Sequence, residues 1–127
     1  MRIYVDSNIL IEHLRGNSKA KVFFKKIDQE QKYELWIGAM QRAEIVFFMR
    51  PNEEALTTEF LSQFQCAGID QEVVDISGRI YRNWHKSHGV DPNDALLAGT
   101  VQKTGGKICT LNLKHFPMKD IIVEKPW

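Results

Sequence analysis

The feature that most constrains this chain is its first stretch, residues 2–14, where a short apolar run passes almost directly into a helical pattern. Residues 3–5 are β-branched or aromatic, which favours a strand buried in a parallel sheet. Ser7 is a residue type that caps helices, and apolar residues at positions 9, 10, 11 and 14 recur at helical spacing. Asp6 is therefore expected at the carboxyl end of the first strand, where open α/β sheets bind ligands. A plain strand end or helix cap explains a lone aspartate equally well, so the rest of the chain must decide.

The alternation of strand-like and helical segments continues to the end of the chain. Further strands are expected near residues 35–37, 65–69, 107–110 and 121–123, and helices over 18–31, 39–50, 52–64, 71–87 and 92–104. This order predicts a three-layer α/β/α fold around a central, mostly parallel sheet of four to five strands. A chain of 127 residues is expected to form a single domain, residues 1–127.

The composition is that of an ordinary globular protein, with 43% hydrophobic and 26% charged residues. No apolar run approaches the roughly 18 residues of a membrane span, and no secretory signal is evident, so a cytoplasmic protein with no membrane association is expected. Cys66 and Cys109 are predicted to be free and buried. A net charge of +1 neither requires nor excludes nucleic acid. Basic residues that could hold phosphates lie near both ends, at positions 15, 19, 21, 25 and 26 and at 103, 107 and 114, although most lysines are expected to be solvated helix faces.

One acid is out of place in the segment 39–50. Glu44 lies four residues from Met40 and Phe48 and three from Phe47, so it projects from the apolar face of the predicted helix. A carboxylate in that position must be paired, protonated or bound to a cation.

A second misplaced acid lies in the segment 91–104, DPNDALLAGTVQKT. Asp91 as N-cap and Pro92 at the first position make a strong helix start, which puts Asp94 at the third position. An acid there is often only a partner of the helix dipole. Asp94 nevertheless lines up with the apolar residues 97, 98 and 101, and small residues at 95 and 99 are expected to let this helix approach the sheet closely.

Asp6, Glu44 and Asp94 could therefore converge at one edge of the sheet. Three carboxylates in one pocket repel each other unless cations neutralise them. Oxygen ligands suit Mg²⁺ or Mn²⁺, and such ions promote phosphodiester hydrolysis. Thr110 and Asn112 share a face at the end of the strand near 107–110, since side chains alternate along a strand.

Three segments carry a resemblance to a known family. YVDSNILIEHLRG at the start, AEIVFF around Glu44 and DALLAGTVQKTGGKICTLNLKHF near the end occur in the same order as in PIN-domain ribonucleases, specifically VapC-type toxins of toxin-antitoxin pairs. The last segment resembles the D-x-L-I-A-A-x-A helix of that family followed by its T-x-N-x-x-D-F motif. The resemblance implies a PIN-like fold and a Mg²⁺- or Mn²⁺-dependent endoribonuclease.

The resemblance also implies roles for individual residues. Asp6, Glu44 and Asp94 match the three core acids, which are both catalytic and metal-binding. Asn8 would organise the first loop, and Thr110 and Asn112 would support the site; a further metal ligand from Asn112 or Asp91 stays open. His115 departs from the family pattern, because an aspartate usually occupies that position. The loss of this acid could leave one ion where relatives bind two.

The resemblance further implies an RNA substrate, a cognate antitoxin that inhibits the enzyme, and a homodimer. The alternative is a catalytically silent PIN-like module that binds RNA or protein. A phosphotransferase with Asp6 as nucleophile is disfavoured, because that chemistry usually needs a second aspartate where Asn8 stands. His13 and His115 are expected to be surface groups, and His85 and His88 have no evident partner ligand.

Overall fold

Five parallel strands form the centre of the molecule. The computed structural model describes all residues, 1–127. The strands are β1 (Arg2–Val5), β2 (Glu34–Gly38), β3 (Gln65–Ala67), β4 (Lys107–Cys109) and β5 (Ile122–Glu124). They pair in the order β3-β2-β1-β4-β5, and every pairing is parallel. The predicted sheet is therefore confirmed, with β1 at its centre.

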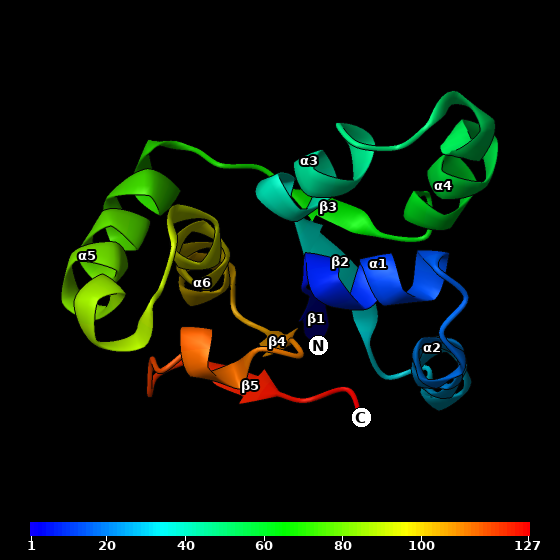
Figure 1. The fold of residues 1–127 in the computed structure, drawn as a ribbon. Coiled ribbons are helices and arrows are strands. Elements are labelled where there is room, and N and C mark those ends of the chain that lie inside the picture. Colours follow the sequence, from blue (N-terminus) through cyan, green and yellow to red (C-terminus); the bar gives the residue numbers. More distant parts are fainter.

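Helices cover both faces of this sheet (Figure 1). The first two crossovers carry α1 (Ser7–Leu14), α2 (Ser18–Glu30), α3 (Ala39–Val46), the short 3-10 turn η1 (Pro51–Glu53) and α4 (Glu54–Leu61). The long return from β3 to β4 carries α5 (Gln71–His88) and α6 (Pro92–Thr104), and η2 (Leu113–His115) precedes β5. No helix combines the length and the apolar character that crossing a bilayer requires.

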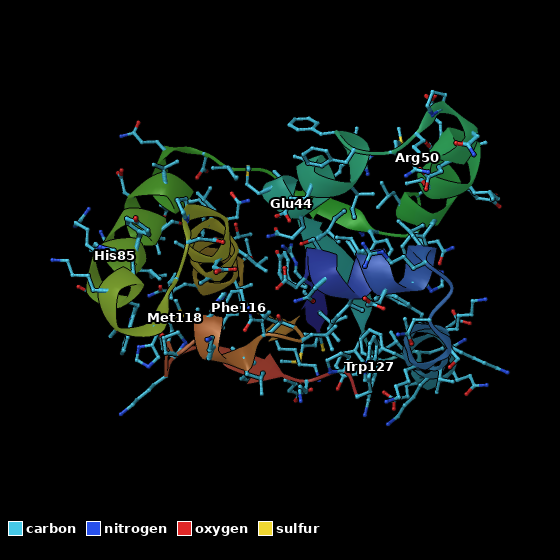
Figure 2. The ribbon with its side chains drawn as sticks, in the orientation of Figure 1. Glu44, Arg50, His85, Phe116, Met118 and Trp127 are labelled. Carbon is cyan, nitrogen blue, oxygen red and sulfur yellow. The ribbon has the colours of Figure 1, made fainter.

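The core consists of two apolar clusters, one on each face of the sheet. Ile3 and Val5 of β1 point into the cluster shared with α1, α2, α3 and α4, whereas Tyr4 between them points into the cluster shared with α5 and α6. Phe116 and Met118, which follow η2, belong to this second cluster and lie below α6 in Figure 2. A β1 strand that is apolar on both faces is what a central parallel strand requires.

The strand order reverses direction between β1 and β4, the two neighbouring strands at the centre of the sheet. The chain runs from β1 outward to β2 and β3, then crosses over β1 to add β4 and β5 on its other side. The carboxyl ends of β1 and β4 lie at this reversal, the usual ligand-binding position in open α/β sheets. Asp6 directly follows β1, and Thr110 directly follows β4.

Three expectations about apolar residues are wrong. The third helix was expected to reach residue 50, but α3 ends at Val46, which leaves Phe47 and Phe48 with 76% and 80% of their surfaces exposed. Leu56, expected to face inward with Phe60, is also exposed. Cys66 is free but exposed on the edge strand β3, whereas Cys109 is free and buried as expected. Spacing identifies an apolar stripe, but it does not decide whether that stripe meets the core.

Gly99 was expected to let α6 approach the sheet, but it serves a contact between two helices instead. A Cβ at Gly99 would lie 2.0 Å from Ser77 Oγ on α5. The missing side chain therefore brings α6 against α5, because Ser77 occupies the space that any larger residue would need. Ala95, by contrast, is buried in the cluster beneath α6.

Candidate active site

Asp6 joins the ends of the two central strands. Its backbone N–H donates to the carbonyl of Cys109 at 3.0 Å, and its Oδ2 accepts a hydrogen bond of 2.8 Å from Thr110 Oγ1. Its Oδ1 accepts from the Ser7 N–H at 2.8 Å, so the N-cap of α1 is Asp6. The sequence had suggested Ser7 for this position. Asp6 thus caps α1 and still turns its carboxylate toward the end of β4.

Asn8 ties the first turn of α1 to the chain after β4. Its Oδ1 accepts from the Leu111 N–H at 3.3 Å, and its Nδ2 donates to Thr110 Oγ1 at 3.4 Å. Thr110 is fully buried, and its Oγ1 also accepts from the Asn112 N–H at 3.0 Å. These contacts fix the loop after β4 against the loop after β1, which is the geometry that the role suggested for Asn8 requires.

Glu44 reaches the same edge from α3 (Figure 2). Ser7 Oγ donates to its Oε2 at 2.9 Å, and Asn93 Nδ2 on α6 donates to its Oε1 at 3.3 Å. Ser7 therefore links the neighbourhood of Asp6 to Glu44. Sequence analysis missed both supporting residues: Ser7 was taken only as a cap, and Asn93 was not singled out although it precedes Asp94.

Asp94 lies in the first turn of α6 and forms a reciprocal cap with Asp91. Asp91 Oδ1 accepts from the Asp94 N–H at 2.8 Å, and Asp94 Oδ2 accepts from the Asp91 N–H at 3.2 Å. The cap expected at Asp91 is confirmed. Asp94 also lies at the same edge of the sheet as Asp6 and Glu44, and we call this group of three carboxylates the acidic edge. Only 14% of the Asp94 side chain is exposed.

His115 is part of this edge, contrary to the expectation of a surface position. Its Nδ1 lies 3.1 Å from Asp94 Oδ2 and 2.9 Å from Asn112 Nδ2. η2 supplies both His115 and the turn that starts at Asn112. The imidazole occupies the position where the T-x-N-x-x-D-F motif would place a carboxylate.

Burial, with a smaller contribution from neighbouring acids, raises the pKa values of Asp6, Glu44 and Asp94. Burial is the first cause of the raised pKa of Asp6, and the bonds from Thr110 and Ser7 only partly oppose it. Burial also raises the pKa of Glu44, with the charges of Asp6 and Asp91 adding to it. The pKa of Asp94 is raised to about 7, again first by burial and then by the charges of Asp91 and Asp6. The charged forms of these acids are therefore disfavoured, and no lysine or arginine forms an ion pair with Asp6, Glu44 or Asp94 to offset this.

The donor set fits a divalent ion in its chemistry. Asp6, Glu44 and Asp94 offer carboxylate oxygens, the ligands that Mg²⁺ and Mn²⁺ prefer. Their raised pKa values show that a positive charge would relieve their repulsion. As arranged, no three His, Cys, Asp or Glu side chains stand at metal-binding distance from a common point. The acids gather at one edge without forming a closed cage.

Two of the candidate basic residues are engaged elsewhere. Lys107 Nζ donates to Glu124 at 2.8 Å and to Tyr33 at 3.1 Å, and its side chain is only 10% exposed. It borders a hollow of about 580 Å³ between α2 and Trp127. Figure 2 shows Trp127 well below Glu44, on the side away from the acids. Lys103 pairs with Asp70 and Glu72 of the α5 start. Lys114, beside His115, is exposed.

His13 was also expected at the surface, but it packs between aromatic rings. It stacks on Phe60 with ring centroids 4.3 Å apart and meets Phe24 edge-on at 5.1 Å. Its Nδ1 is buried without a hydrogen-bond partner. This histidine joins α1 to α2 and α4 and has no part in the acidic edge.

The sequence model of the PIN domain family matches residues 3–118, which is nearly the whole chain. The chain therefore belongs to the PIN domain family, and within it to the VapC-type ribonucleases. It is 30% identical over 115 residues to Ribonuclease VapC19 of Mycobacterium tuberculosis, covering 90% of this chain and 91% of the relative.

Solved structures share the fold over the full chain. A toxin-antitoxin complex from Klebsiella pneumoniae has a chain that superposes with a TM-score of 0.79 at 23% identity, covering 98% of each chain. DNA-bound VapBC from Salmonella typhimurium gives a TM-score of 0.81 at 19% identity, covering 100% of this chain and 99% of the other. At such identities the likeness establishes the fold alone.

Proposed function

We propose that this chain is a Mg²⁺- or Mn²⁺-dependent endoribonuclease that hydrolyses RNA phosphodiester bonds and acts as the toxin of a toxin-antitoxin pair. The curated relatives are ribonucleases by name, and the chain aligns with them over nine-tenths of its length. The observation that carries the proposal is the acidic edge, where Asp6, Glu44 and Asp94 each have a raised pKa.

In this mechanism Asp6, Glu44 and Asp94 would hold the ion. When bound, the ion would neutralise the scissile phosphate and make water a stronger nucleophile. Thr110 and Ser7 orient the Asp6 carboxylate through bonds of 2.8 Å each. These bonds fix the acid in place before substrate arrives.

Glu44 is the residue we assign to proton transfer. Ser7 and Asn93 hold its two carboxylate oxygens, and burial raises its pKa, which makes this carboxylate a stronger base toward water. Its side chain remains partly exposed, so a water molecule can reach it.

The partners proposed are RNA, a cognate antitoxin and a second copy of the chain, with action in the cytoplasm. The related structures include toxin-antitoxin complexes, which supports an antitoxin here. Phe47, Phe48 and Leu56 leave large apolar surfaces exposed around α3 and α4, a property typical of protein contact surfaces. Light scattering of the purified chain, alone and with its antitoxin, measures both associations; a monomer at all concentrations would contradict the homodimer.

The proposal is tested by incubating antitoxin-free protein with total RNA in the presence of Mg²⁺, Mn²⁺ or EDTA. Asp6→Asn and Asp94→Asn keep the side-chain shape and remove a charge. Asp28→Asn, an exposed position on α2, is the matched control. We expect cleavage by the wild type and by the control only with metal, and its loss in the two site variants.

Two outcomes would contradict the endoribonuclease. Cleavage that persists in EDTA or in both site variants would show that these acids are not the metal site. Folded protein that binds RNA and leaves it intact under every condition would favour the silent binding module instead.

A further inference from the structure

His115 is held in one place by three different parts of the chain. Its Nδ1 faces Asp94 Oδ2 from α6, and the amide nitrogen of Asn112 lies 2.9 Å from Nδ1 and 3.5 Å from Nε2. On the opposite side, a Cβ at Gly89 would lie 3.8 Å from Nε2, so the ring rests against the turn after α5. The side chain is 24% exposed, which leaves the ring confined but reachable from solvent.

The separation of His115 Nδ1 and Asp94 Oδ2 matches that of two ligands on one ion. Adjacent ligands of an octahedral ion with bonds of about 2.1 Å stand about 3 Å apart. The observed distance is 3.1 Å. An unprotonated Nδ1 has one lone pair, which can bind a cation once the Asn112 amide nitrogen, 2.9 Å away, turns from it. The carboxylate oxygen beside it is a donor as well. A cation shared by the two atoms would turn this contact into a pair of coordinate bonds.

We propose that His115 is a ligand of the active-site ion, so that this site offers a ring nitrogen beside carboxylate oxygens and favours a first-row transition ion such as Mn²⁺ over Mg²⁺. Mg²⁺ is a hard cation that takes oxygen ligands, whereas imidazole suits first-row transition ions. The inference rests on the proposed metal-dependent function and adds to it a nitrogen ligand from the residue that departs from the family motif.

The other histidines are engaged in contacts of their own. The chain contains four histidines. His13 stacks on Phe60, and His85 Nδ1 is bonded to the carbonyl of Tyr81. His88 Nδ1 is bonded to Ser87 Oγ near the end of α5. A nitrogen signal from a bound ion that depends on residue 115 therefore identifies His115.

The experiment loads the purified full-length chain with one equivalent of Mn²⁺ and records electron spin-echo envelope modulation, which detects nitrogen bound to Mn²⁺. Isothermal titration gives the dissociation constants of Mn²⁺ and Mg²⁺ for the same samples. The variants are His115→Asp, which restores the family's oxygen ligand, and His115→Phe, which keeps a ring without a donor. His88→Gln removes an exposed histidine elsewhere and is the matched control.

We expect nitrogen modulation in the wild type and in His88→Gln, and none in His115→Asp or His115→Phe. The preference for Mn²⁺ over Mg²⁺ should fall about tenfold or more in His115→Asp, the size of effect that changes around a metal site produce. Bound Mn²⁺ without nitrogen modulation in the wild type, or with modulation that persists in His115→Asp, would overturn the role of His115 and leave the proposed nuclease intact. Failure of the wild type to bind either ion would overturn both.

Discussion

Asp94 gives the clearest test of the electrostatics, because its ionisation near neutral pH lowers the free energy of unfolding of the metal-free protein. Its folded pKa of about 7 lies above its ordinary value of 3.8, so between these values the folded state binds more protons than the unfolded state. Stability contributed by Asp94 is therefore present at low pH and is lost as the pH rises through the folded pKa. We expect Asp94→Asn to remove this loss.

The magnitude follows from the size of the pKa shift. A shift of about three units corresponds to about 4 kcal/mol, of which about two units, or about 3 kcal/mol, fall between pH 5 and pH 7. Solvent at the open edge screens part of this energy, so we expect an effect of about 1–2 kcal/mol. The amide of asparagine can still accept the bond from the Asp91 N–H, so the cap of α6 is retained.

The assay is urea unfolding in EDTA at pH 5 and pH 8, followed by circular dichroism. The difference in unfolding free energy between Asp94→Asn and wild type should be more favourable to the variant at pH 8 than at pH 5 by about 1–2 kcal/mol. Taking this difference cancels the contribution of His13, which lies away from the acids and titrates in both proteins. Asp28→Asn should show no such change. An equal difference at both pH values would refute the reasoning, as would a variant that loses stability at pH 8.

The remaining predictions concern packing, capping and a second titration. Gly99→Ala should lower the free energy of unfolding by about 1–3 kcal/mol, because its Cβ would lie 2.0 Å from Ser77 Oγ, and Ser77→Ala in the same chain should recover part of the loss in urea unfolding. Asn17→Ala should cost about 1 kcal/mol by the same measurement, since its Oδ1 caps α2 through two backbone N–H groups; an unchanged midpoint would show that the cap contributes nothing. Burial lowers the pKa of His13, so stability should be lost as the pH falls below about 6.5, and a melting temperature of His13→Phe that drops just as steeply as that of the wild type would contradict this.

The sequence was a good guide wherever local patterns have one three-dimensional meaning. All five strands and six helices occur in the predicted order and close to the predicted positions, although α3 ends four residues early, because an alternating βα chain has few ways to bury both faces of a sheet. The positions of two of the three acids could be predicted in the same way, because Asp6 follows a strand and Asp94 starts a helix at a recognisable cap. Their roles as metal ligands and catalytic groups stay predictions.

What the sequence concealed depends on contacts between distant segments. The pairing of Ser7 with Glu44 spans 37 positions and that of Asn93 with Glu44 spans 49, and no local pattern marks either. Phe47 had the spacing of a buried residue, yet α3 ends before it. The family motif marked position 115, but the contact of His115 with Asp94 is visible only in the fold.

The bond between Asp6 and Thr110 has a consequence for the time at which activity arises. These residues lie 104 positions apart, and β1 cannot complete its pairing until β4 has been synthesised. A chain emerging from the ribosome therefore carries Asp6 long before it carries the strand that fixes it. An enzyme that attacks RNA would therefore stay inert during most of its own translation and become active only after β4 has been made.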